Sequence, residues 1–381
     1  MRSLPVILLS CCLMLPACSP SPQQGRLLWQ NKLPGTVQLQ PDNGMLYYDG
    51  SSFTLLDADL QSLASRSAIP GTGAAGSFTQ MMFSISYTTP MYEGPAGMFL
   101  CNSYGQYQLV NRDKPLELIT LESPLTGENA STGILRNSAG LMCFLAGRAL
   151  VLQQYQLLVA YDLRGRQLWQ FMADDSSVMY PSAAGDRLLV ASRIGNVYCL
   201  DADGNLLWQR TGSYMSTGLG KQLLLADQLS GGLLCLDWDG KEIWQREFPA
   251  GALVQVLSGN AACGRALVNL PGRLLCLDGS AATLWQASVP EEGRSSLLLA
   301  DDGYAFQLYE HYGSSGILGG RIARRAGRQA QWTCYTPAGQ RMWVFNNVPD
   351  YADGAVAGSQ GHLFMSDLNS REFSCYGPPA P

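Results

Sequence analysis

The chain has 381 residues, of which 46% are hydrophobic and only 14% are charged. This composition predicts a well-packed globular body and excludes a largely disordered chain. The formal net charge is -5 and the 25 basic residues are scattered, so the sequence lacks the basic patch with which proteins bind nucleic acid.

The N-terminal segment is typical of an export signal. Met1-Arg2 precedes an apolar run that ends at Leu15, which is shorter than the roughly 20 apolar residues that span a membrane. The run continues as Leu15-Pro16-Ala17-Cys18, which resembles a bacterial lipobox, although Pro16 is unusual there. We expect residues 1–17 to be removed, Cys18 to carry the lipid and residues 18–24 to form a flexible tether. An ordinary signal peptide followed by a chance cysteine is the alternative.

The rest of the chain, residues 25–381, contains internal repeats. In five segments of sixteen residues, a Trp follows an Asp or Thr by seven positions: 156–171, 195–210, 231–246, 272–287 and 330–345. Two weaker copies, 51–66 and 105–120, have Ala64 and Leu118 in place of the Trp. Each copy predicts a β-hairpin with a tight Asp-x-x-Gly turn, preceded by a further strand.

These small antiparallel sheets cannot bury their faces alone, so successive sheets must pack face to face around a ring, with the Trp side chains between them. The chain ends part-way through an eighth copy, whose last strand is missing. Residues Gly25–Asn31 align with Gly204–Arg210 and supply that strand. The sequence therefore predicts an all-β, monomeric, eight-bladed β-propeller whose ring is closed by the N-terminal strand.

The repeat motif G-x-L-x-A/C-L-D-x-x-G-x-x-L-W resembles the PQQ-like repeat of quinoprotein dehydrogenases and of the BamB-type propeller lipoproteins of the outer-membrane β-barrel assembly machinery. The resemblance covers essentially the whole mature chain. It implies a non-enzymatic envelope lipoprotein that serves as a scaffold for a protein partner, with outer-membrane protein assembly as its leading role. Such a protein would sit on the outer membrane facing the periplasm in a cell with two membranes, and otherwise on the outer face of the cell membrane.

Two other functions are alternatives to the scaffold. A PQQ-dependent dehydrogenase would carry a vicinal Cys-Cys pair, calcium ligands and a catalytic Asp, but the only adjacent pair here, Cys11-Cys12, lies in the signal segment. We therefore predict no enzyme, no catalytic residue and no bound cofactor. A ligand-binding or sensor propeller that uses its central channel stays open as the alternative.

Eight cysteines follow Cys18, and five of them occupy one slot of the repeat: Cys199, Cys235, Cys276, Cys334 and Cys375. Ala160 and Leu109 fill the same slot in other copies, so the slot is small and apolar. We expect buried packing thiols. Metal binding is the alternative, but the chain has no CxxC motif and only two histidines, so no metal site is predicted.

The longest interval between repeats, from Asp278 to Thr336, exceeds the roughly 40 residues that a blade of this kind needs. It contains an aromatic strand, a Gly/Ser stretch and an arginine-rich segment, and it predicts a protruding hairpin. Tyr and Arg are enriched at interface hot spots, so five of its residues are candidates for a partner-docking edge: Tyr312, Arg321, Arg324, Arg325 and Arg328. The alternative is a core strand with a solvated tip.

Overall fold

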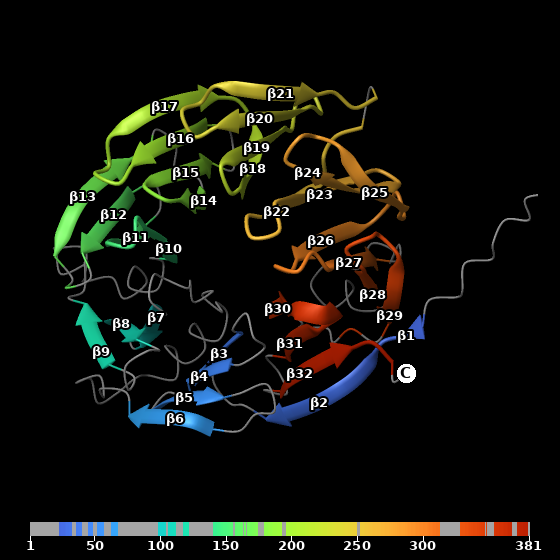
Figure 1. The fold of residues 1–381 in the computed structure, drawn as a ribbon, viewed down its shortest axis with the longest axis horizontal. Helices are drawn as coiled ribbons and strands as arrows, with labels where there is room; N and C mark the ends of the chain where they lie inside the picture. Colours follow the sequence, from blue (N-terminus) through green and yellow to red (C-terminus); the bar gives the residue numbers. More distant parts are fainter. Residues whose placement is uncertain are drawn as a thin grey trace, which may run out of the picture.

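The computed structural model is a ring of small β-sheets, in which the strands of each sheet follow one another from the centre of the ring toward its rim (Figure 1). The structure describes residues 23–32, 36–39, 45–48, 52–56, 62–67, 98–103, 106–111, 117–121, 140–154, 157–162, 164, 166–173, 179–192, 196–249, 252–312, 328–346, 348, 354–367 and 372–379. Besides strands, these residues include the 3-10 turn η4 (Ser359–Gly361).

The described strands form eight sheets. In chain order, the first four sheets contain β3 (Thr36–Leu39), β4 (Met45–Tyr48), β5 (Ser52–Leu56) and β6 (Ser62–Ser67); β7 (Met98–Ser103), β8 (Gln106–Asn111) and β9 (Glu117–Leu121); β10 (Gly140–Leu145), β11 (Ala149–Gln154), β12 (Leu157–Asp162) and β13 (Gln167–Met172); and β14 (Met179–Ala184), β15 (Arg187–Ser192), β16 (Asn196–Asp201) and β17 (Leu206–Thr211).

The next three sheets contain β18 (Tyr214–Leu219), β19 (Gln222–Asp227), β20 (Leu233–Asp237) and β21 (Glu242–Arg246); β22 (Val256–Asn260), β23 (Arg265–Leu270), β24 (Arg273–Asp278) and β25 (Thr283–Ser288); and β26 (Arg294–Leu299), β27 (Ala305–Tyr312), β28 (Arg328–Tyr335) and β29 (Arg341–Phe345). The last sheet contains β30 (Gly354–Ala357), β31 (Leu363–Asp367) and β32 (Glu372–Gly377). The prediction of an all-β fold made of small antiparallel sheets is confirmed.

The N-terminal strand β2 (Arg26–Lys32) is the fourth strand of this last sheet, because it pairs antiparallel with β32. Trp29 lies opposite Cys375, as Trp208 lies opposite Cys199 in the sheet of β14–β17. Before β2, the two-residue strand β1 (Gln23–Gln24) pairs with the rim strand β29 of the neighbouring sheet. Gln23 and Gln24, which the sequence assigned to the tether, thus belong to the folded ring.

The core is divided into layers between neighbouring sheets. In β16, Val197 and Cys199 pack with residues of the sheet of β18–β21, whereas Tyr198 and Leu200 pack with residues of the sheet of β10–β13. Because side chains of a strand alternate between its two faces, one strand contributes to two layers. This explains why central strands are buried along their length, while the rim strand β17 has many exposed residues.

In three of the repeats, the Trp fastens one sheet to the turn between the third and fourth strands of the next sheet, whereas the buried indole N–H of Trp285 has no hydrogen-bond partner among the described residues. The Trp169 indole donates a hydrogen bond to the Ala202 carbonyl at 2.9 Å, and the Trp208 indole donates one to the Trp238 carbonyl at 3.0 Å. Gly204, which has a φ of +81°, leaves room for Trp169: a Cβ atom there would lie 2.6 Å from the ring. The motif therefore holds sheets together as well as forming hairpins.

Replacing Gly204 with Ala is expected to lower the free energy of unfolding by about 3 kcal/mol or more, from left-handed backbone strain plus overpacking against Trp169. Gly264→Ala is the matched control. Gly264 has a φ of +64°, but a Cβ atom at this position would have no neighbouring atom within 4 Å, so we expect only the backbone cost of about 1 kcal/mol there. Chemical denaturation of both variants measures the difference, and equal losses would mean that the Trp contact contributes little.

Candidate functional site: the two faces of the ring

The ring presents two faces that differ in which turns they carry. In the sheets whose four strands follow one another in the chain, the Asp-turn face carries the turns between the first and second strands and between the third and fourth strands. The hairpin face carries the turns between the second and third strands, and the links between sheets. Because the strands of a sheet are antiparallel, β27 and β28 connect on the hairpin face, and so do β19 and β20.

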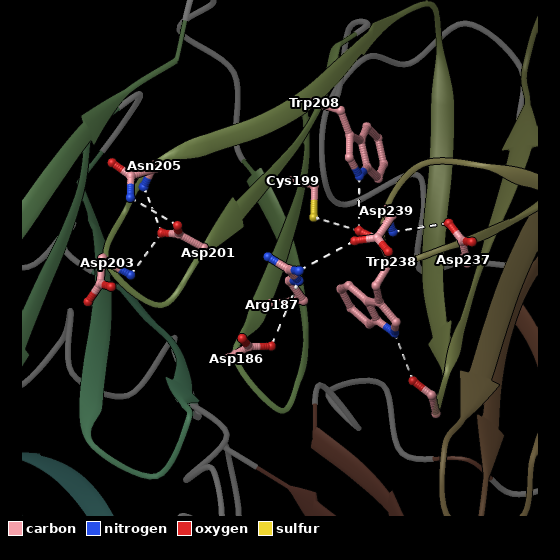
Figure 2. A network of polar contacts seen from close by, with 11 residues as sticks. Asp186, Arg187, Cys199, Asp201, Asp203, Asn205, Trp208, Asp237, Trp238 and Asp239 are labelled. Atoms are coloured by element: carbon pink, nitrogen blue, oxygen red, sulfur yellow. Dashed lines mark hydrogen bonds and ion pairs between the residues drawn. The ribbon is translucent and has the colours of Figure 1, made fainter.

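On the Asp-turn face, the Asp of each motif organises its own turn. The carboxylate of Asp201 accepts hydrogen bonds from the backbone N–H groups of Asp203 and Asn205, both at 2.9 Å (Figure 2). In the sheet of β22–β25, the hydroxyl of Ser280 donates to Asp278 at 2.7 Å, and this bond lowers the pKa of the Asp278 carboxyl. The acidic residue of the motif is thus a turn-forming group.

Ion pairs on the same face join neighbouring sheets. Arg187, at the start of β15, contacts Asp239 in the turn between β20 and β21 at 3.3 Å, and it also contacts Asp186 at 3.8 Å (Figure 2). One sheet earlier, Arg148 contacts Asp203 at 2.7 Å. These pairs are exposed, so each contributes little stability. Their charges already have partners within the ring.

On the hairpin face, β27 and β28 project beyond their neighbour β26. The first residue of β26, Arg294, lies opposite Glu310, and the hairpin continues through His311–Gln329 and Tyr312–Arg328. The structure thus brings two of the predicted docking residues, Tyr312 and Arg328, opposite each other at the end of a hairpin.

The other three predicted docking residues, Arg321, Arg324 and Arg325, lie outside the described residues, as does Cys18. At the base of the hairpin, Phe306, Trp332 and Cys334 are buried. Its aromatic base therefore belongs to the core, as the alternative interpretation of the sequence held.

Sequence reasoning missed two exposed leucines on the hairpin face. Leu229, in the turn between β19 and β20, is 79% exposed, and Leu253, in the link before β22, is 43% exposed. The turn is held in place because Asp227 accepts a hydrogen bond from the Leu229 N–H at 2.8 Å and Gln228 donates one to the Val254 carbonyl at 3.0 Å. A leucine within the polar turn sequence Asp-Gln-Leu-Ser-Gly was the available signal.

The five cysteines of the repeat slot are buried free thiols, as the sequence predicted. Burial raises the pKa of Cys199 to about 12 and that of Cys235 to about 11, and it also raises the pKa of Cys276 and Cys375 to about 12. These thiols are therefore protonated near neutral pH. The described part of the chain contains no group of three or more His, Cys, Asp or Glu side chains that could hold a metal ion.

In the native protein near pH 8, the five slot thiols are expected to resist alkylation, whereas half-buried Cys263 should react before them. Since an unfolded thiol has a pKa near 8.5, the unfolded chain releases these protons at lower pH than the folded chain does. The free energy of unfolding should therefore fall as the pH rises above about 8.5, by up to about 2 kcal/mol per thiol near pH 10. Peptide mapping after alkylation and urea titrations at two pH values measure both effects. Rapid alkylation of Cys199 before Cys263 would contradict the buried-thiol assignment.

Comparison with known families agrees with this architecture. The model of the family described as outer membrane protein assembly factor BamB matches residues 123–254 and 154–376, which together make up more than half of the chain. The chain belongs to the BamB family. The BamB-type repeat resemblance seen in the sequence is thus confirmed. Among the residues that the structure places, no helix is long and apolar enough to cross a membrane.

Solved structures with the same fold are distant in sequence from this BamB-family chain. The C-terminal WD40 domain of Sif2 is 10% identical, with coverage of 94% of this chain and 99% of that one and a TM-score of 0.61. Saccharomyces cerevisiae Sqt1 is 10% identical, with coverage of 95% of this chain and 100% of that one and a TM-score of 0.55. BamB from Moraxella catarrhalis is 11% identical, with coverage of 93% of this chain and 99% of that one and a TM-score of 0.38. No curated protein sequence matches the chain. At these identities the likeness to the Sif2 domain and to Sqt1 shows a propeller fold alone.

Proposed function

We propose that this chain is a cell-envelope lipoprotein, anchored through Cys18, that acts as a non-enzymatic scaffold for another envelope protein during outer-membrane protein assembly. Membership of the BamB family across residues 123–376 is the observation that carries this proposal. The export signal and the lipobox-like Leu15-Pro16-Ala17-Cys18 support the envelope location. The proposed partners are a membrane, through the lipid, and an envelope protein.

The construction of the ring suits a scaffold. Trp side chains, such as Trp169 and Trp208, fasten successive sheets to one another, and a surface that is rigid before binding loses little conformational entropy on binding. Slot thiols held in their protonated form, such as Cys199, offer no reactive nucleophile. Binding, and not covalent chemistry, is what these described residues favour.

The hairpin face is the proposed docking side. It carries the projecting end of β27–β28, where Tyr312 lies opposite Arg328, and it exposes Leu229. Arg321, Arg324 and Arg325 follow in the sequence between these two strands and complete the proposed docking edge. On the opposite face, by contrast, Arg187 and Arg148 are paired with carboxylates of neighbouring sheets.

The test uses the full lipoprotein in its own cells. An Arg324→Ala/Arg325→Ala variant is expected to reduce recovery of the outer-membrane β-barrel assembly machinery from crosslinked membranes by about tenfold or more, as loss of an interface hot spot would, while its melting temperature stays unchanged. Arg164→Ala/Arg166→Ala, in the turn between β12 and β13, is the matched control and should leave recovery unchanged. If the Arg324→Ala/Arg325→Ala variant recovers the assembly machinery fully, the docking edge lies elsewhere on the protein. If the wild-type protein recovers no assembly components, the proposed function is wrong.

A further inference from the structure

The two residues before β2 lie along the rim of the ring. In β1, Gln23 lies opposite Trp343 and Gln24 opposite Val344, both on the rim strand β29, and the Gly25 N–H donates a hydrogen bond to the Val344 carbonyl at 2.6 Å. The β1–β29 pair is parallel, whereas the other pairs between described strands are antiparallel. Figure 1 shows β1 at the outside of the ring, next to β29 and ahead of β2.

The rim strand β29 differs from its counterparts at the positions that β1 covers. After the repeat Trp, four other rim strands, β13, β17, β21 and β25, each have an exposed glutamine: Gln170, Gln209, Gln245 and Gln286. In β29 this position is Val344, which is 8% exposed, and Trp343 before it is fully buried. The strand is thus adapted to carry a further segment of chain on its outer edge.

The same pairing sets the side from which the chain arrives. Strand β29 begins at the Asp-turn face, where Gly339 and Gln340 precede it, and runs toward the hairpin face. Because β1 is parallel to β29, it enters the rim at Gln23 from the Asp-turn side. Two exposed arginines lie close in sequence to the Gln23–Trp343 pair: Arg26 at the start of β2 and Arg341 at the start of β29.

Only five residue steps separate Cys18 from Gln23, and a fully extended chain of that length spans at most about 18 Å. We propose that the rim formed by β29 and the start of β2, with Arg26 and Arg341, is the surface that the ring holds against an anionic lipid bilayer, so that the ring stands on its edge. This orientation rests on the lipidation of Cys18 in the proposed function. It leaves the hairpin face free for a protein partner.

A photocrosslinking amino acid placed at Gln340 tests the orientation. Gln340 and Arg166 occupy the same repeat position, four residues after Thr336 and Asp162, on sheets that lie across the ring from each other (Figure 1). In lipidated protein bound to phosphatidylcholine vesicles that contain phosphatidylglycerol, crosslinking to lipid is expected to be at least about fivefold higher from Gln340 than from Arg166. Equal yields, or a higher yield from Arg166, would overturn the orientation.

Charge reversal separates the rim contact from the anchor itself. Arg26→Glu/Arg341→Glu is expected to lower the Gln340 crosslinking yield by about fivefold or more on vesicles with phosphatidylglycerol, and to leave it unchanged on phosphatidylcholine alone. Arg164→Glu/Arg210→Glu, away from the rim of β29, is the matched control. If the Arg26→Glu/Arg341→Glu variant stays bound to vesicles and its crosslinking yield is unchanged, the two arginines do not face the lipid. The lipid anchor at Cys18 would still be supported by that result. If wild-type protein isolated from its own membranes binds no vesicles, both the lipid anchor and this orientation fail.

Discussion

A protein that lacks Gly25–Asn31 is expected to be severely destabilised, with a loss of at least about 5 kcal/mol, which is comparable to the whole stability of many domains. The deletion removes the rim strand that pairs with β32, from the Arg26–Gly377 pair to the Asn31–Phe373 pair. It exposes the edge of β32 and the apolar surface behind it, where Cys375 is now buried.

The same deletion also uncovers the neighbouring sheet. Gly25 lies against the ring of Trp343, just as Gly204 lies against Trp169, and its N–H bonds to Val344. Two sheets therefore lose their rim contacts in one step. Thermal unfolding followed by circular dichroism measures the effect.

The control for this deletion is a soluble protein that begins at Gln23, which keeps β1 and β2 and should melt at the temperature of one that begins at Ser19. A synthetic peptide of residues 23–32 should restore part of the lost stability to the deleted protein in a concentration-dependent way. If the deleted protein melts at the wild-type temperature, the ring does not depend on the N-terminal strand for closure.

Replacing Cys18 with Ser is expected to move the protein completely from the membrane to the soluble fraction and to abolish incorporation of labelled fatty acid. Stable anchoring needs more than one acyl chain, and we propose that the whole attachment is made at this thiol. The melting temperature should not change, because Cys18 lies before the first described strand, which begins at Gln23. Cys12→Ser, in the same N-terminal segment, is the matched control and should keep both the label and the membrane location. Unchanged labelling of the Cys18→Ser protein would refute the lipoprotein assignment.

The local pattern of the repeat was sufficient to predict the sheets. A Trp seven residues after Asp201 or Asp237 marks a hairpin whose partner strands are now seen as β16–β17 and β20–β21. The information is local, since a tight turn sets the register of the two strands that it joins. The alignment of Gly25 with Gly204 placed β2 as the last strand of its sheet, and in the structure both glycines meet a Trp from the preceding sheet.

The candidate docking surface could be predicted only in part. The long interval before Thr336 indicated the hairpin, and Tyr312 and Arg328 do lie opposite each other at its outer end. Leu229 and Leu253 were missed because they lie in different segments, Leu229 in the turn between β19 and β20 and Leu253 in the link between the sheets of β18–β21 and β22–β25. Only the stacking of those sheets places both of them on one face.

The amino-acid sequence by itself determined the strands, the turns and the identity of the packing residues, because each depends on neighbours within one repeat. Only the tertiary structure decided which side chains join successive sheets, such as the indole of Trp208 bonding to the Trp238 carbonyl. It also placed Gln23 and Gln24 on the edge of β29 instead of in the tether. Such contacts join residues that are distant in the chain or carry no motif, so they exist only once the ring has brought the sheets together.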